Sequence, residues 1–376
     1  MKVLFSGALL LLMCSAVIAQ NSDDLKLNQI QVIGSHNSYK KLPDPRVMKF
    51  MMKMRKRLGA DADPIRIDYG HMPFDSQFAY HMRGLEIDIY NDPKGGTLYK
   101  RKINAFVHGV PVRSGVEELR KPGFKVLHIK DVDYQTHYYT FKESLIAVKK
   151  WSDAHPNHLP IFINVEPKTG GPADHSKTLR FLGFKRVVPF DSAAYDAIDA
   201  EIRSVFGDDL KSILTPDKLR GKYASLGDMA QHNGWPALDE CRGKIVLIML
   251  GGSKTDYLKG HPELAGRAMC VYGREGKSET AFIMQDESIG DSANIIKLIK
   301  EGYIVRTRSD IETMDARAND PHRKIVAMQS GAQIISTDYY VPDLRLSNFE
   351  VQWDGKHSGR VNPILLPQRA GEWVKE

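Results

Sequence analysis

The stretch Leu159-Pro160-Ile161-Phe162-Ile163-Asn164-Val165-Glu166-Pro167-Lys168 decides the fold class. Its first seven residues are almost all apolar, and a strand that is apolar on both faces is typical of a parallel sheet covered on both sides. The strand runs into Glu166, and the carboxyl ends of parallel strands are where α/β folds carry their reactive groups. The stretch therefore predicts an α/β fold with a functional carboxylate at one edge of its sheet.

Seven further strand-like runs complete the pattern. They lie near residues 31, 86, 126, 247, 283, 305 and 334, and helical patterns fit most of the gaps between them. One such helix is expected over 47–58, where Met and other apolar residues recur at helical spacing and form a packing face. Eight strands alternating with helices predict a TIM (β/α)8 barrel as a single domain over residues 20–376. No Gly-rich dinucleotide or phosphate-loop motif appears, which argues against a nucleotide cofactor.

The first nineteen residues have the composition of a secretory signal peptide. Lys2 provides a positive start, an apolar run extends to Ile18, and small residues precede Gln20. We expect cleavage after Ala19 and a mature protein that is secreted or periplasmic. Nothing later in the sequence approaches the apolar length of a membrane span.

Composition and charge limit the kinds of molecule that this protein is expected to bind. The net charge of +7 is modest and spread along the chain, and basic clusters at 49–57 and 100–102 suit either an anionic membrane surface or simply solvent. No nucleic-acid motif is present, and we expect a monomer. Cys241 and Cys270 remain after signal cleavage, and they form either one disulfide or two buried thiols.

The stretch Ile33-Gly34-Ser35-His36-Asn37-Ser38-Tyr39 ends the first strand of the mature chain. Gly and Ser break the apolar alternation, so His36 and Asn37 are delivered to the strand end. Histidine exchanges a proton near neutral pH, and an asparagine carbonyl is a neutral ligand for a hard cation. The same composition is also ordinary for a turn.

Two neighbouring strands carry further polar groups. The run Gly84–Tyr90 alternates, so Glu86 and Asp88 share one face, and such a pair repels unless a cation or solvent relieves it. Because the other face is apolar, we expect this acidic pair to point inward. His128 lies in the strand-like run 124–129, and His108 and His137 are its alternatives.

In a barrel, the carboxyl ends of the strands ring one mouth, so residues far apart in the sequence meet there. The expected group contains His36, Asn37, Glu86, Asp88, His128 and Glu166. Three carboxylates and an amide form an oxygen-rich set that suits Ca²⁺, and no HExxH motif supports zinc. The two histidines are then available for proton transfer.

With these residues in these positions, the chain resembles the calcium-dependent phosphatidylinositol-specific phospholipase C family, in particular its secreted microbial branch with a single barrel. The resemblance covers nearly the whole mature chain, and its segments appear in the family's order. They are Ser35 to Tyr39, Arg83 to Asp88, Val126 to Ile129, Pro160 to Lys168, Ile304 to Arg308 and Ser336 to Tyr340.

The resemblance implies roles for these residues. One Ca²⁺ ion would be held by Asn37, Glu86, Asp88 and Glu166, and His36 and His128 would be the catalytic pair. The residues expected to contact the phosphate or stack on the inositol ring are Lys168, Arg306, Arg308 and Tyr340. The substrate would be the phosphatidylinositol head group, reached by transient contact of the barrel rim with a membrane surface.

The implied reaction is attack of the inositol 2-hydroxyl on the adjacent phosphodiester, which yields diacylglycerol and a cyclic or open inositol phosphate. His128 is expected to protonate the departing oxygen and His36 to donate a hydrogen bond to the phosphoryl oxygens. Glu86 and Glu166 both remain candidates for the general base.

Three other functions compete with this one. A glycerophosphodiester phosphodiesterase usually has His-Arg-Gly where this chain has His36-Asn37-Ser38. A non-catalytic barrel that binds calcium and lipid head groups needs no pair of histidines. A glycosidase using Glu86 and Glu166 leaves the histidines without a role. Residues 100–120 depart from the family pattern, so the head-group preference stays open.

Overall fold

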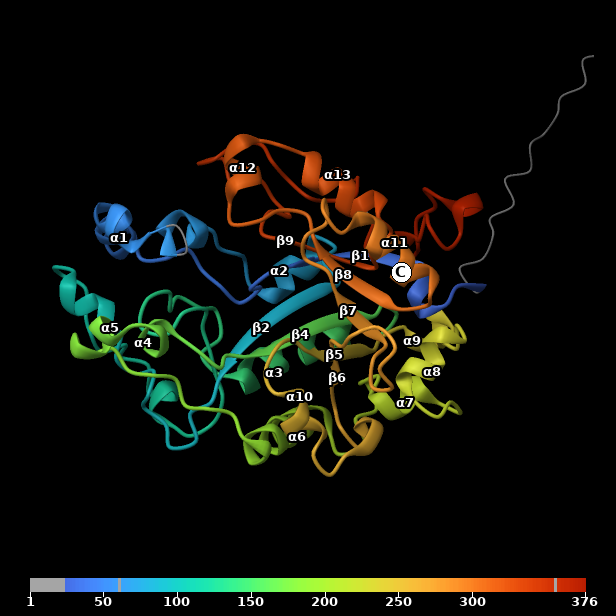
Figure 1. The fold of residues 1–376 in the computed structure, drawn as a ribbon, viewed down its shortest axis with the longest axis horizontal. Helices are drawn as coiled ribbons and strands as arrows, with labels where there is room; N and C mark the ends of the chain where they lie inside the picture. Colours follow the sequence, from blue (N-terminus) through green and yellow to red (C-terminus); the bar gives the residue numbers. More distant parts are fainter. Residues whose placement is uncertain (1–23, 60–61, 355–356) are drawn as a thin grey trace, which may run out of the picture.

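Eight parallel strands form a nearly closed barrel at the centre of the molecule (Figure 1). The computed structural model describes residues 24–59, 62–354 and 357–376, so the expected signal peptide lies outside the described residues. Around the barrel the strands follow the order β1, β2, β4, β5, β6, β7, β8, β9. A single parallel bridge between Tyr272 and Phe282 joins β6 to β7 and completes the ring. The predicted TIM barrel is confirmed.

The barrel strands are short. Their bounds are β1 Ile30–Ser35, β2 Gly84–Tyr90, β4 Ile161–Pro167, β5 Ile245–Met249, β6 Cys270–Val271, β7 Phe282–Met284, β8 Ile304–Arg308 and β9 Ile334–Thr337. Two more strands pair outside the ring: β3 (Lys125–Val126) is antiparallel to the end of β2, and β10 (Arg360–Val361) is antiparallel to β1.

One of the eight predicted strands is therefore wrong. The run 124–129 does not enter the barrel, because only β3 within it is extended and it pairs with Ile89 and Tyr90 at the outer end of β2. The eighth barrel strand is β6, which the sequence did not reveal. Two residues are too few to give a periodic signal.

Helices surround this barrel on the outside. They are α1 Pro45–Leu58, α2 Phe74–Ala79, α3 Phe141–Ala154, α4 Pro172–His175, α5 Lys177–Phe181, α6 Ser192–Phe206, α7 Pro216–Arg220, α8 Leu226–Gln231, α9 Leu238–Cys241, α10 Lys254–Leu258, α11 Ser292–Lys300, α12 Met314–Ala318 and α13 His322–Gln329. Helix α1, predicted over 47–58, begins at Pro45 and is capped by Asp44, whose carboxylate accepts from Arg46 N. Helices α1, α4 and α5 gather at one end of the barrel, on the left in Figure 1.

A close approach of two glycines positions the first two strands. The only paired residues of β1 and β2 in the described part of the chain are Gly34 and Gly84. A Cβ atom on Gly34 would lie 2.4 Å from the Gly84 Cα, so a side chain at this position would force the strands apart. The two strands can therefore bring the residues that follow Gly34 against Glu86.

The apolar side chains of the described residues form one large core and three smaller clusters. The core fills the barrel and the space beneath its helices, whereas one of the smaller clusters lies around Met51, Ile103 and Phe184, beside the barrel rather than in it. Cys241 and Cys270 are both buried and free, so the disulfide alternative is wrong. Among the described helices, none has the length and apolar character needed to cross a bilayer.

Candidate functional site

The turn after β1 is fastened to β2. Asn37 adopts a left-handed backbone conformation with a φ of 49°, which asparagine tolerates better than most residues. Ser38 N donates to the Glu86 carbonyl oxygen at 3.0 Å, and Glu86 N donates to the Ser38 hydroxyl at 2.8 Å. The motif Ser-His-Asn-Ser thereby fixes His36 and Asn37 beside the acidic strand.

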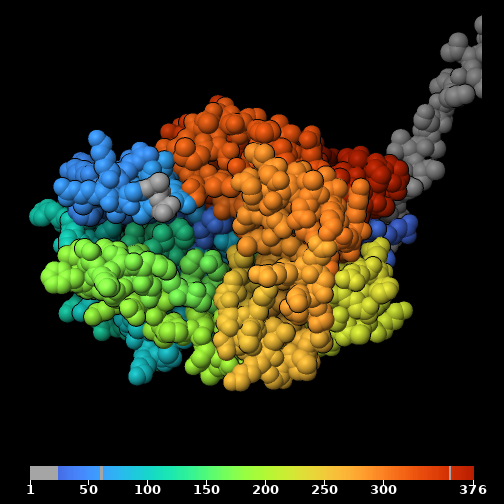
Figure 2. Space-filling model, in the orientation of Figure 1, coloured from blue at the N-terminus to red at the C-terminus, as the bar shows by residue number. Residues whose placement is uncertain are grey.

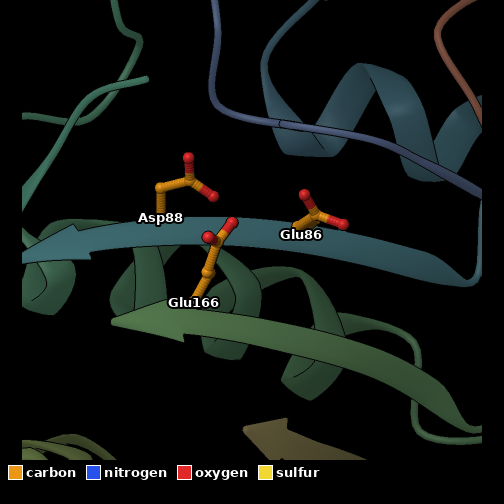
Figure 3. A group of neighbouring side chains, drawn as sticks. All are labelled: Glu86, Asp88 and Glu166. Carbon is orange, nitrogen blue, oxygen red and sulfur yellow. The ribbon is translucent and has the colours of Figure 1, made fainter. Parts of the chain in front are cut away.

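Three carboxylates lie close together on neighbouring strands at this position (Figure 3). Glu86 and Asp88 come from β2 and Glu166 from β4, and Asp88 is the register partner of Glu166. One carboxylate oxygen from each lies within 4.8 Å of the others. Burial, with Glu166 adding to it, raises the pKa of Glu86 to about 7 despite the nearby Arg306, and burial also raises the pKa of Asp88 well above its usual value. The expected inward acidic pair is present.

Two side-chain cations contact this acidic cluster. The Lys168 ammonium lies 3.1 Å from both Asp88 and Glu166, and the Arg306 guanidinium lies 2.7 Å from Glu86. Arg306 is also paired with Asp286 at 2.8 Å, so its charge is shared. Three clustered carboxylates are thus only partly neutralised by the protein.

The side chains fit a calcium ion. The side-chain amide of Asn37 reaches this cluster, and it lies 3.2 and 3.3 Å from the two carboxylate oxygens of Asp88. Asn37, Glu86, Asp88 and Glu166 together present the oxygen donors that Ca²⁺ prefers.

His36 is held by a carboxylate that is itself held by an arginine. Its Nδ1 lies 2.8 Å from Asp338, and Arg308 lies 2.8 Å from the other oxygen of Asp338. Although burial acts in the opposite direction, Arg308 and His36 hold the pKa of Asp338 well below its usual value. Burial and Arg308 lower the pKa of His36 to about 3. The imidazole is therefore neutral with its proton on Nδ1, and the unprotonated Nε2 lies 3.5 Å from Glu86 and 3.3 Å from the side-chain amide of Asn37.

His128 has a matching arrangement. Its Nδ1 lies 2.8 Å from Asp133, and the buried ammonium of Lys40 lies 3.2 Å from the same carboxylate oxygen. Burial lowers the pKa of His128. Although His128 follows β3 rather than a barrel strand, it lines the same cavity as His36, Arg308 and Asp338.

Of the four residues predicted to contact the substrate, only Arg308 lines this cavity. Lys168 and Arg306 lie against the acidic cluster. Tyr340 is 1% exposed, its hydroxyl accepts from Met72 N, and its ring stacks on His71. A ring in this position packs within the protein, so the structure does not support the expected stacking of Tyr340 on the inositol.

Sequence reasoning missed the carboxylates that orient the two histidines. Asp338 immediately follows β9, so the rule that found Glu166 at a strand end could also have found it. Asp133 carries no such signal, because it lies in a loop that returns toward β3.

Comparison with known proteins identifies a family for this chain. The family model of Ca²⁺-dependent phosphoinositide phospholipase C matches residues 25–363. The solved calcium-dependent phosphoinositol-specific phospholipase C of a Pseudomonas species is 17% identical, with a TM-score of 0.51 over 90% of this chain and 96% of that chain. The Ca²⁺-dependent phosphatidylinositol-specific phospholipase C of Streptomyces antibioticus is 15% identical, with a TM-score of 0.48 over 84% and 95%. No curated protein sequence matches.

At 17% identity the likeness to the Pseudomonas structure shows the fold alone, whereas the family match spans most of the chain. The chain belongs to the family of Ca²⁺-dependent phosphoinositide phospholipases C.

Proposed function

We propose that this protein cleaves phosphatidylinositol in a Ca²⁺-dependent reaction, releasing diacylglycerol and an inositol phosphate that is first formed as the cyclic ester. The observation that carries the proposal is the placement of the acidic cluster next to His36. This cluster contains Glu86, Asp88 and Glu166, and its neighbour His36 has one nitrogen held by Asp338. Bound Ca²⁺ would lower the pKa of the inositol 2-hydroxyl and offset the negative charge that develops on phosphorus.

The two histidines divide the proton transfers. Because Asp338 keeps the proton of His36 on Nδ1, Nε2 is suited to accept the proton of the attacking hydroxyl. This reverses the expected role of His36 as a donor and adds it to Glu86 and Glu166 as a candidate base. His128 would protonate the diacylglycerol oxygen, with Asp133 stabilising the imidazolium form. Arg308 lines the same cavity as the two histidines and would contact the phosphate.

We also propose that the end of the barrel carrying α1 and α5 contacts the membrane. The outer face of α1 exposes Lys49, Lys53 and Arg57, and Phe181 at the end of α5 is 91% exposed. Basic side chains near an exposed aromatic ring suit an anionic lipid surface. Phe181→Gln should weaken binding to vesicles that contain phosphatidylinositol, measured by co-sedimentation. Unchanged binding would contradict this placement.

The reaction is tested with purified protein and phosphatidylinositol, in Ca²⁺ and then in chelator, by following water-soluble inositol phosphates with phosphorus NMR. We expect a cyclic inositol phosphate that requires Ca²⁺ and disappears in His36→Ala. His232→Ala is the matched control, because His232 is exposed and lies at the end of α8, outside the cavity. If the protein does not cleave phosphatidylinositol but Ca²⁺ still raises its melting temperature, the metal site is supported and this substrate is rejected.

We further propose export with cleavage after Ala19, and a monomeric mature protein. N-terminal sequencing of protein recovered from the periplasm or the medium should begin at Gln20, and size-exclusion chromatography should give the mass of one chain. Recovery from the cytoplasm with Met1 retained would contradict export.

A further inference from the structure

A large cavity joins the proposed catalytic groups to an apolar wall. Its volume is about 1100 Å³, above the roughly 300–1,000 Å³ of most ligand pockets. His36, His128 and Arg308 line one end. Much of the remaining lining is apolar and includes Phe50, Met54, Ile103, Phe106, Leu179 and Phe184. The cavity is therefore polar at one end and apolar along much of its length.

The apolar wall is built by segments that the barrel core does not require. Phe50 comes from α1, Phe106 from the 3₁₀ helix η5 (Lys102–Phe106), and Phe184 from the loop after α5. Phe106 stacks on both of the other rings, with centroid distances of 6.5 Å to Phe50 and 6.2 Å to Phe184. These segments lie on one side of the molecule, where Figure 2 shows α1 in blue and α4 and α5 in yellow-green. Residues 100–120, whose role was left open, thus contribute to the cavity.

Charged residues of the cavity wall are paired within the protein. Asp63 forms an ion pair with Arg55 at 2.7 Å, and Arg66 forms one with Glu312. These pairs leave the aromatic wall as the main surface available to a ligand on this side. Exposed charges that already have partners contribute little to selecting a ligand.

We propose that the apolar wall holds one acyl chain of the phospholipid whose head group lies at the polar end. The lipid would then be partly withdrawn from the bilayer during cleavage. This inference rests on the proposed function and extends it from the head group to the rest of the substrate.

The chemistry of the wall selects an acyl chain over other occupants. A peptide would bring backbone N–H and C=O groups that the aromatic and aliphatic side chains cannot satisfy. A sugar would bring hydroxyl groups that the wall also leaves without hydrogen-bond partners. The hydrocarbon tail of an acyl chain has no polar groups, and its attachment through glycerol to a phosphodiester matches the position of Arg308 and the histidines at the other end.

The test uses n-alkyl phosphates with six, eight and ten carbons, which carry a phosphate and a chain but no inositol. Their binding to the Ca²⁺-loaded protein is measured by calorimetry below the concentration at which they form micelles. We expect the Kd to fall with each added methylene, by up to about fourfold. Met54→Gln and Leu179→Gln should flatten this dependence. Both side chains are only partly buried, so these variants retain the fold.

Leu344→Gln is the matched control. It also replaces an apolar side chain with an amide, but Leu344 is 77% exposed and lies outside the cavity lining. It should leave the chain-length dependence of the wild type unchanged.

A Kd that does not depend on chain length would overturn the inference. So would a dependence that both wall variants retain in full. Turnover of phosphatidylinositol is measured separately, so the two proposals can fail independently. Binding that depends on chain length and on Met54 and Leu179, without turnover, would keep the acyl-chain site and reject the proposed substrate.

Discussion

Replacing Glu86 with glutamine should stabilise the metal-free protein and remove its response to calcium. The Glu86 side chain is 2% exposed, and burial raises its pKa from 4.5 to about 7. Between these pH values the folded protein binds a proton that the unfolded chain has released, so stability falls as the pH rises. Above pH 7 the loss is roughly 3 kcal/mol. Glutamine has the shape of the neutral acid and avoids this loss.

The expected result is a crossover between two conditions. In chelator at pH 8 the Glu86→Gln variant should melt about 3–6 °C above the wild type, at roughly 1–2 °C per kcal/mol for a chain of this length. At pH 4.5 the two should melt together. Adding Ca²⁺ at pH 8 should raise the melting temperature of the wild type and have little effect on the variant, because one charged ligand is lost.

Scanning calorimetry at pH 4.5, 6 and 8, in chelator and in Ca²⁺, measures all of these differences. Glu117→Gln is the control, because Glu117 is 69% exposed on the 3₁₀ helix η6 (Glu117–Arg120) and should change neither the pH dependence nor the calcium response. A Glu86→Gln variant that melts below the wild type in chelator at pH 8 would refute the reasoning about burial. A full calcium response in this variant would remove Glu86 from the metal site.

Three further substitutions test the packing and the charges. Gly34→Ala should cost about 3 kcal/mol or more in urea unfolding, and more than Gly84→Ala, because its Cβ would lie 2.4 Å rather than 3.0 Å from the facing Cα; equal losses would contradict this. Lys168→Met should tighten Ca²⁺ binding about tenfold in calorimetry, since the ammonium no longer competes for Asp88 and Glu166; weaker binding would argue against competition. Asp338→Asn should lower kcat about 100-fold with little change in KM, because the proton of His36 would no longer be held on Nδ1. An unchanged kcat would show that Asp338 has no role in catalysis.

The barrel and the acidic cluster could be predicted because their signals are local. The apolar run before Glu166 indicates a strand buried on both faces, and the alternation of 84–90 places Glu86 and Asp88 on one side. The topology of a barrel then brings strand ends together without any knowledge of side-chain packing. The same argument failed at 124–129, where the apolar composition is that of a strand but the chain pairs antiparallel to β2.

The partners of these groups could not be predicted, because they depend on distances across the fold. Arg306 lies 220 positions from Glu86 in sequence yet 2.7 Å away in space. The position of Arg306 in an alternating strand is equally consistent with a contact to a phosphate. Only the packed structure shows that Arg306 contacts a carboxylate. The pairing of Asp133 with both His128 and Lys40 is of the same kind.

The sequence by itself determined the parallel barrel, the inward acidic pair and the histidine at the end of the first strand, because periodicity and strand ends are properties of neighbouring residues. The tertiary structure alone decided which strand closes the ring, which cations sit on the carboxylates and which carboxylates orient the histidines. It also decided that α1, η5 and the segment after α4 enclose a cavity with an apolar wall. These features arise from burial and from contacts between distant segments, and neither leaves a periodic trace in the chain.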